Sequence, residues 1–285
     1  RNNAMKLKRQ VFSYPYIVWM ALFIAVPMVF IFYYAFNVDG SFSFSKAWAT
    51  LSDISKWRVL WVSIEIAAGT TIFCLLLGYP MAYYIAHRSQ TAQKFLYMLV
   101  MLPMCMSFLL RTLAWVGMLE DTGILNTILQ RLGIGPLPLI RTNGAVILGM
   151  VYNYLPYMIL PLYSVIMKID NRLIEAALDL GCTPLQSFFK VELPAILPGV
   201  LSGLIMAFTL SLDDFVISYF TSGSDFQTLP ILIYSMTKKE VKPDIYALST
   251  LIIITILVLL LLSNFIGSRS EAHGKSKKAK KEAGN

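Results

Sequence analysis

The chain has 285 residues, of which 57% are hydrophobic and only 14% are charged. An ordinary soluble domain has about 45–50% apolar and about 25% charged residues, so this composition excludes a soluble globular domain and a disordered chain. The net charge of +8 does not indicate a nucleic-acid-binding protein, because the apolar residues are concentrated in long blocks. The composition predicts an integral membrane protein with no nucleic-acid partner.

Six apolar blocks are long enough to cross the hydrocarbon core as helices, which takes about 20 residues each. They cover residues 11–36, 59–86, 95–119, 144–167, 195–220 and 245–267. We therefore predict an all-α fold with six transmembrane helices in a single permease-like domain at 5–267. The first block is too long for a cleaved signal peptide. Residues 1–4 stand ahead of Met5 and are expected to be a remnant of cloning.

The distribution of Lys and Arg predicts the orientation in the membrane, because these residues favour the cytoplasmic side. More of them lie on one side when both termini and the segments 87–94 and 168–194 are placed there, which predicts cytoplasmic termini. Much of this excess comes from the Lys-rich tail at 268–285, which we expect to be disordered and near anionic lipid. The tail sequence His273-Gly-Lys-Ser276 lacks the earlier glycine of a nucleotide-binding loop.

The segment at 168–194 contains signals for two short helices between two membrane spans. Asp170 or Asn171 is placed to cap the first helix, Gly181 to end it and Thr183 to cap the second. A compact, partly apolar helix pair at this place suits either a docking surface for a soluble partner or a structural connector. The periodicity alone leaves both interpretations open.

The same segment has a recognisable spacing. Glu175-Ala-Ala177, Gly181, Val191 and Leu193-Pro194 match the pattern EAA-X3-G-X9-I-X-LP, with Val in place of Ile. This pattern resembles the signature of ABC importer permeases. The resemblance implies a type I ABC importer permease fold in which the loop is a coupling helix that contacts a cytoplasmic ATPase. It assigns this contact to Glu175, Ala176, Ala177, Gly181, Leu193 and Pro194.

The resemblance narrows to the spermidine/putrescine permeases. The chain is PotB-like from about residue 59 to 181, including Leu77-Gly-Tyr-Pro80, and PotC-like from Phe208-Thr-Leu-Ser-Leu-Asp-Asp-Phe215 onward. The resemblance implies a multi-pass permease of the bacterial inner membrane that serves an ATP-driven polyamine importer. Its partners would be ABC ATPase subunits that hold ATP and Mg²⁺, an extracytoplasmic polyamine-binding protein, and either a sister permease or a second copy. The alternative is an importer for another solute, such as a ferric complex, a sulfonate or a phosphonate.

Charged residues inside the predicted spans are candidates for the transport path. Glu65, Asp213, Asp214 and Arg111 lie there, and an ionised carboxylate at mid-membrane costs about 2.5–3.5 kcal/mol unless it faces a cavity or a partner. Ser211 and Asp214 are three residues apart on the predicted helix and are expected to share a face. One interpretation is that an aspartate pairs with Arg111 or caps a helix break. The resemblance instead places Ser211, Asp213 and Asp214 on the polyamine path.

For several other residues of the predicted spans, the sequence leaves two possible roles open. Glu65 suits either the path or the outer interface. Several aromatic residues suit either cation–π contact with ammonium groups or ordinary packing; these are Trp61, Trp115, Tyr154, Tyr157, Phe215 and Tyr219. Gly199-X-X-X-Gly203 predicts a close approach of two helices.

The sequence gives little support to a membrane-embedded enzyme, which would need a nucleophile and base or metal ligands at membrane depth. The two histidines, His87 and His273, lie near or beyond the span ends, and neither HExxH nor Gly-X-Ser-X-Gly occurs. Cys74, Cys105 and Cys182 lack metal-binding spacing. We therefore predict no catalytic residue, metal site or cofactor in this chain. A purely structural subunit would explain neither the loop pattern nor the buried acids.

Overall fold

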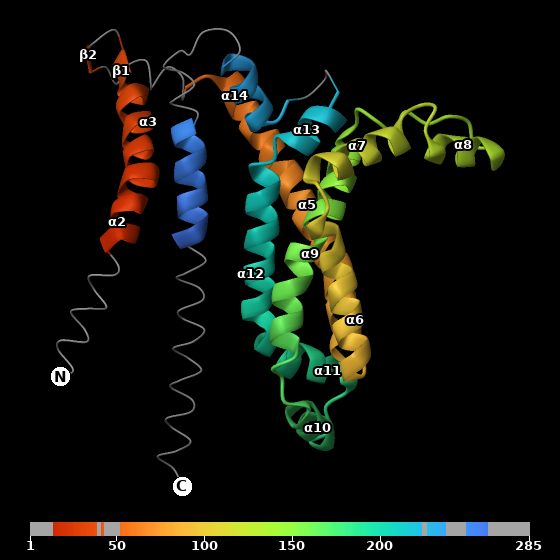
Figure 1. Ribbon diagram of the computed structural model, residues 1–285. Helices are drawn as coiled ribbons and strands as arrows, with labels where there is room; N and C mark the ends of the chain where they lie inside the picture. Colours follow the sequence, from red (N-terminus) through yellow and green to blue (C-terminus); the bar gives the residue numbers. More distant parts are fainter. Residues whose placement is uncertain (1–13, 39–40, 43–51, 224–226, 238–248, 262–285) are drawn as a thin grey trace, which may run out of the picture. The chain divides into compact units, whose positions relative to one another are not determined.

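The computed structural model describes residues 14–38, 41–42, 52–223, 227–237 and 249–261 (Figure 1). The chain divides into two compact units, one with Arg1–Arg58 and Leu232–Thr255, the other with Val59–Ile231 and Ile256–Asn285. The expected cloning remnant at 1–4 and the basic tail at 268–285 lie outside the described residues. The second unit contains the predicted coupling loop and the intramembrane acids.

The first unit begins with an apolar helix that has one wide turn. Helix α2 (Tyr14–Met20) passes through the π-helical turn η1 (Ala21–Ala25) into α3 (Val26–Phe36). The wide turn lies directly ahead of Pro27, whose ring lacks a donor and crowds the preceding turn. A short antiparallel ladder follows, β1 (Asn37–Val38) with β2 (Ser41–Phe42), and it is an exception to the predicted all-α fold.

The second unit is built on three long helices. These are α5 (Ile54–Ala86), whose first residues belong to the other unit, α9 (Asn143–Ile166) and α12 (Leu193–Leu212). Short α11 (Pro184–Ser187) and the π-helical turn η3 (Phe188–Glu192) run into α12, so Leu193-Pro194 forms the first turn of α12 within one continuous helical segment, Pro184–Leu212. The last predicted block is described as a helix over Ser249–Leu261, and α14 (Leu229–Thr237) precedes it; each of these two helices has residues in both units.

Three helices of the described chain are long and apolar enough to cross a membrane: Ile54–Ala86, Asn143–Ile166 and Pro184–Leu212. A fourth is counted only if the bent pair Gln90–Cys105 and Phe108–Arg131 is one span. Apart from the short β1–β2 ladder, the helical architecture of a membrane protein is therefore confirmed, whereas the count of six spans stays a prediction.

The third predicted span is not continuous. Helix α6 (Gln90–Met101) ends in the 3₁₀ turn η2 (Leu102–Cys105), and α7 (Phe108–Leu119) and α8 (Ile124–Arg131) follow after a bend of 89°. The block at 95–119, predicted to cross the membrane as a helix, is therefore broken and bent rather than one continuous helix. Pro103 supplies the physical reason, because it cannot donate the helical hydrogen bond and suits the start of a tight turn.

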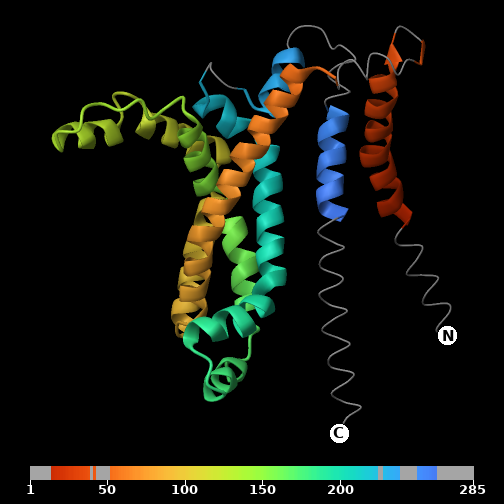
Figure 2. The same ribbon diagram turned by 180° about the vertical axis from the view of Figure 1, so that it is seen from behind.

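Helices α9 and α12 lie side by side and form the centre of the core (Figures 1 and 2). The predicted glycine pair is at their contact. A Cβ atom on Gly199 would lie 2.8 Å from Val165 Cγ2 and 3.1 Å from the Pro161 carbonyl oxygen, and one on Gly203 would lie 2.6 Å from Met158 Sδ. The prediction of a close helix approach at these glycines is confirmed.

This geometry predicts that replacing each of the two glycines by Ala lowers the stability of the protein by a different amount. Gly199→Ala should destabilise the protein more than Gly203→Ala, because the tightest contacts at Gly199 are with the branched Val165 side chain and the Pro161 carbonyl oxygen. At Gly203 the tightest contact is with the flexible end of Met158, and the Met158 carbonyl oxygen is farther away, at 3.3 Å. Overpacking at Gly199 should cost about 1–3 kcal/mol. The control is Gly117→Ala on α7, where a Cβ atom meets nothing within 4 Å. The midpoint of heat inactivation in detergent is the measurement, and equal midpoints for all three variants would contradict the assignment.

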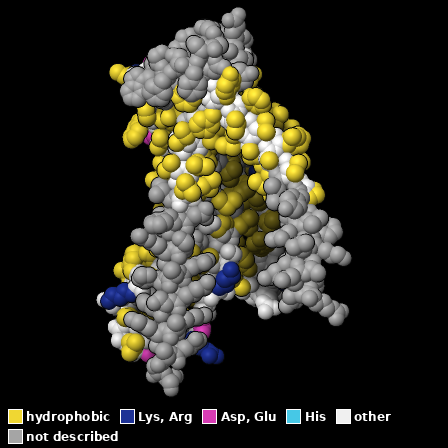
Figure 3. All heavy atoms as spheres, turned by 90° about the vertical axis from the view of Figure 1, so that its left-hand side faces the viewer, with side chains coloured by type: hydrophobic (Ala, Val, Ile, Leu, Met, Phe, Trp, Pro, Cys, Tyr) yellow, Lys and Arg dark blue, Asp and Glu magenta, His cyan; other side chains and the backbone are white. Residues whose placement is uncertain are grey.

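The described surface is largely apolar, as expected for a membrane protein. Figure 3 shows hydrophobic side chains over much of it, with most of the visible charged side chains in the lower part of the view. Long apolar side chains such as Leu76, Leu99 and Leu110 are exposed in the isolated chain. An exposed apolar surface of this extent is stable only against lipid or other subunits.

Candidate functional site

The two adjacent aspartates, Asp213 and Asp214, lie in a break between two helices. Helix α12 ends at Leu212, and α13 (Val216–Thr221) begins after residues 213–215. The helical-face argument for Ser211 and Asp214 is therefore wrong, because Asp214 lies beyond the end of α12. The last carbonyl groups of a helix have no helical N–H partner and form the negative end of its dipole. A break at this place therefore favours cations.

Asp214 is held by two hydrogen bonds. Its side chain is buried, the Tyr154 hydroxyl donates to Oδ1 at 2.9 Å, and the backbone N–H of Ser218 donates to Oδ2 at 3.0 Å. The second bond caps the first turn of α13, which explains why the chain leaves the α12 conformation here. Capping of a helix break, one of the two interpretations drawn from the sequence, thus describes Asp214.

Asp213 has a different environment although it is the adjacent residue. Its side chain is exposed, and no hydrogen bond or ion pair within the described residues engages its carboxylate. Ser211, at the end of α12, is buried, and its hydroxyl has no hydrogen-bond partner there. The break therefore combines one satisfied carboxylate with one that is open to a ligand.

Arg111 does not pair with either aspartate in the described structure. It lies on α7 with only 8% of its surface exposed, and its Nε and Nη1 atoms lack hydrogen-bond partners among the described residues. The guanidinium carbon is 5.7 Å from the centre of the Phe108 ring, which stacks on Tyr154 with ring centres 6.4 Å apart. The buried cation is therefore linked to the Tyr154–Asp214 hydrogen bond through successive contacts of the Phe108 and Tyr154 rings.

Two further predicted path residues are not brought to this break by any described contact. Glu65 is exposed on α5, and no described hydrogen bond or ion pair includes its side chain. Trp115 is half-buried on α7 and packs edge-on against Tyr152, with ring centres 5.3 Å apart. Their roles stay predictions.

The loop at 168–194 folds as its sequence signals predict. The Asp170 carboxylate accepts a hydrogen bond from the backbone of Arg172 and caps α10 (Asn171–Asp179). Gly181 follows α10 with φ of +85°, a left-handed conformation that favours glycine. Thr183 and Gln186 form a reciprocal capping box at the start of α11.

The exposure of the loop residues is uneven. Glu175 and Ala176 are exposed on α10, whereas Ala177 is only 8% exposed and packs against its own chain. The predicted docking face therefore offers one of its two alanines. Leu185 and Phe189 are 69% and 56% exposed, so the α11–η3 segment presents a separate apolar surface. Of the last two predicted residues, Leu193 is half-buried and Pro194 is exposed.

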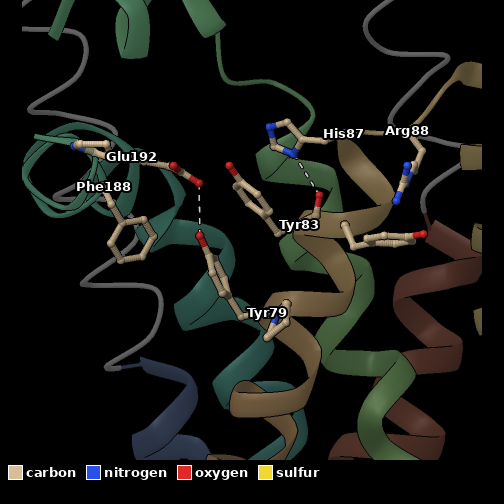
Figure 4. Close-up of a pocket in the computed structure, with 9 residues that line it drawn as sticks. Tyr79, Tyr83, His87, Arg88, Phe188 and Glu192 are labelled. Atoms are coloured by element: carbon tan, nitrogen blue, oxygen red, sulfur yellow. Dashed lines mark hydrogen bonds between the residues drawn. The ribbon is translucent and has the colours of Figure 1, made fainter. Parts of the chain in front are cut away.

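A polar contact that the sequence analysis did not single out joins this loop to α5. The Tyr79 hydroxyl donates to Glu192 Oε1 at 3.2 Å, and the Phe188 ring packs edge-on against the Tyr79 ring with centres 5.9 Å apart (Figure 4). The available signal was an acid, Glu192, two residues ahead of Pro194 at the start of an apolar helix. Its partner is 113 residues away and gives no local signal.

The sequence has clear relatives. Residues 74–272 match the family of the binding-protein-dependent transport system inner membrane component. The chain is 35% identical over 214 residues to the spermidine/putrescine transport system permease protein PotB of Haemophilus influenzae, covering 72% of this chain and 75% of that protein. It is 30% identical over 260 residues to the putrescine transport system permease protein PotI of Escherichia coli, covering 87% and 88% respectively.

The fold is shared with a solved transporter. A chain of a bacterial ABC transporter involved in the import of the acidic polysaccharide alginate superposes with a TM-score of 0.71 at 19% identity, over 94% of this chain and 99% of that chain. The family match covers most of the sequence, and the relatives are matched over three quarters or more of their length. The protein belongs to the family of inner-membrane permease components of binding-protein-dependent transport systems.

Proposed function

We propose that the chain is a permease subunit of an ATP-driven ABC importer for polyamines, with spermidine and putrescine as the substrates. The observation that carries the substrate class is the open carboxylate of Asp213 at the end of α12. The names of the relatives support the same class, since they are spermidine/putrescine and putrescine permeases. The fold does not decide the substrate, because the similar transporter imports an acidic polysaccharide.

The physical chemistry of the break suits an ammonium ligand. An unpaired carboxylate within a membrane span costs about 2.5–3.5 kcal/mol, and a passing cation offsets this cost. The carbonyl ends of α12 add to the negative potential. Asp214 is occupied by Tyr154 and Ser218, so its role is to hold the break open while Asp213 contacts the substrate. A single open carboxylate gives a weak site, which permits release.

The proposal includes the arrangement in the membrane and the partners. Six spans within residues 5–267 place both termini and the 168–194 loop in the cytoplasm of a bacterial cell. A separate ATPase binds ATP and Mg²⁺, hydrolyses the ATP and contacts the loop at Glu175, Ala176 and the bend at Gly181. A sister permease or a second copy completes the path, and a binding protein delivers the polyamine from outside. In this arrangement the chain itself performs no catalysis.

A second candidate is the same machine with an anionic solute. The observation in its favour is Arg111, a buried guanidinium whose Nε and Nη1 have no described partners. An anion site needs an accessible donor, however, and Arg111 is almost fully enclosed, whereas Asp213 is open. The cationic substrate is therefore preferred.

Uptake into proteoliposomes tests this choice directly. The complex purified with its ATPase is reconstituted with ATP inside, and the binding protein and radiolabelled solutes are added outside. We expect ATP-dependent uptake of spermidine or putrescine and none of a sulfonate or phosphonate of similar size. Uptake of the anions in place of the polyamines would overturn the substrate class. Purification without any ATPase would overturn the importer assignment.

A further inference from the structure

A cavity lies where α5 meets the segment that leads from the coupling loop into α12. It has a volume of about 610 Å³ and is lined by the last turns of α5, by the turn between α5 and α6, and by α11 and η3 (Figure 4). This volume is within the range of about 300–1,000 Å³ found for small-molecule sites. Tyr79, Tyr83 and Tyr84 supply most of its aromatic wall.

Opposite charges face this cavity without neutralising each other. Glu192 is only 7% exposed and accepts its described hydrogen bond from the Tyr79 hydroxyl. Arg88 extends over the Tyr84 ring, with its guanidinium carbon 4.2 Å from the ring centre. Figure 4 shows Glu192 and Arg88 on opposite sides of Tyr83, and no ion pair joins them in the described structure. A ligand that carries both a cation and an anion would satisfy both groups.

A second, apolar cavity adjoins the first. It has a volume of about 340 Å³, shares Pro80 and Tyr84 with the first cavity and continues along Leu96, Leu99 and Val100 of α6. Its lining is almost entirely hydrocarbon. A ligand that occupies both cavities would therefore have a charged head and an apolar chain.

The position in the span indicates the source of such a ligand. Both cavities lie at the end of α5, which among the described helices is the longest that is apolar enough to cross a membrane, and beside the basic turn that contains Arg88. Tyrosine and arginine at the ends of spans lie at the level of the lipid headgroups. The adjoining apolar cavity extends along Leu96, Leu99 and Val100, in the apolar part of α6, where acyl chains are expected to begin.

We propose that these two cavities form a binding site for a zwitterionic phospholipid with a primary amine, as in phosphatidylethanolamine. The ammonium group binds Glu192 and the faces of Tyr79 and Phe188, the phosphate binds Arg88, and the start of one acyl chain fills the cavity along Leu99. Charge-assisted hydrogen bonds at both ends give the site its selectivity. An anionic lipid leaves Glu192 without a cation, and a free polyamine uses neither Arg88 nor the apolar cavity.

The site has a direct structural consequence. The bound lipid contacts Glu192 and Phe188, which belong to the π-helical turn η3 in the last part of the 168–194 loop, directly before α12. It therefore fixes α5 to the segment through which ATPase movement would reach the membrane. Loss of the lipid should loosen this contact without affecting insertion of the chain.

The first test uses the unchanged protein complex and varies the lipid. Native mass spectrometry measures lipid retention after incubation with phosphatidylethanolamine, its mono- and dimethylated forms, phosphatidylcholine and phosphatidylglycerol. We expect retention to fall as methyl groups replace the N–H donors, with phosphatidylcholine and phosphatidylglycerol each retained at least about tenfold less. Equal retention of all five lipids would overturn the proposal, because it would show nonselective lipid contact.

The second test locates the site with variants. Glu192→Gln, Arg88→Gln and Leu99→Trp remove the carboxylate, the guanidinium and the space for the chain, and each should abolish the preference for phosphatidylethanolamine. Glu120→Gln and Arg131→Gln are matched controls at exposed positions outside both cavities and should keep it. Arg88 is exposed, so its variant should fold even if Glu192→Gln does not. A different result would identify a polyamine as the occupant in place of the lipid. In that case spermidine would bind the unchanged protein and compete with the lipid, and Glu192→Gln would abolish spermidine binding alone.

Discussion

Replacement of Asp213 by Asn is expected to reduce polyamine uptake at least about tenfold while the complex assembles at its normal level. The carboxylate is exposed at the end of α12 and has no described partner, so its neutralisation removes negative charge without breaking a packing contact. A passing ammonium group loses its counter-charge at a place where the surroundings are apolar. Uptake in proteoliposomes and the yield of assembled complex are the two measurements.

The neighbouring substitution should act through stability instead. Asp214→Asn removes one of the two acceptor oxygens that bind the Tyr154 hydroxyl and the Ser218 N–H, which should cost about 1–3 kcal/mol. We expect a lower yield and a lower midpoint of heat inactivation for this variant than for Asp213→Asn. Asp121→Asn, at an exposed turn after α7, is the matched control and should leave both measurements unchanged.

The same variants would also show if Asp213 does not contact the polyamine. Full spermidine and putrescine uptake by Asp213→Asn would remove the main reason for a cationic substrate and leave the family assignment intact. Loss of assembly in Asp213→Asn would show that this carboxylate has a partner in the complete transporter. The two results differ in protein yield as well as in uptake, so one experiment distinguishes them.

Substitution of the coupling-loop glycine should separate insertion from transport. Gly181→Leu places a side chain at φ of +85°, which costs about 1–2 kcal/mol in that conformation and disturbs the hydrogen bonds from Gly181 and Cys182 that end α10. We expect the chain to stay in the membrane, the co-purified ATPase to decrease, and uptake to fall at least about tenfold. Membrane fractionation and ATPase recovery measure the first two effects.

A glycine with the same backbone conformation provides the control. Gly133 follows α8 with φ of +77° and has open space around it, as Gly181 has, so Gly133→Leu introduces similar strain away from the loop. It should retain its ATPase and most of its uptake. Gly181→Asn should also retain function, because Asn tolerates the left-handed region. Equal losses in Gly181→Leu and Gly133→Leu would show that strain alone, and not the coupling bend, limits transport.

The coupling loop shows how much local sequence determines. The sequence predicts that Asp170 or Asn171 caps the first helix, that Gly181 ends it and that Thr183 caps the second. Asp170, Gly181 and Thr183 do so through contacts within a few residues of themselves. Such signals depend on local backbone geometry and capping, which a short segment specifies by itself. The apolar blocks predicted the membrane class for a similar reason, since hydropathy sums over consecutive residues.

Contacts between helices decided which acidic side chains are buried and hydrogen-bonded, and local sequence signals did not reveal this. Asp213 and Asp214 are adjacent and chemically identical, yet one is open and the other is buried because Tyr154, 60 residues earlier, lies on the packed helix α9. The contact of Tyr79 with Glu192 likewise joins residues 113 positions apart. The sequence by itself determined the membrane class, the loop motif and the candidate acids. The tertiary structure decided the different environments of Asp213 and Asp214, because burial and hydrogen bonding across helices depend on which faces of α5, α9 and α12 pack together.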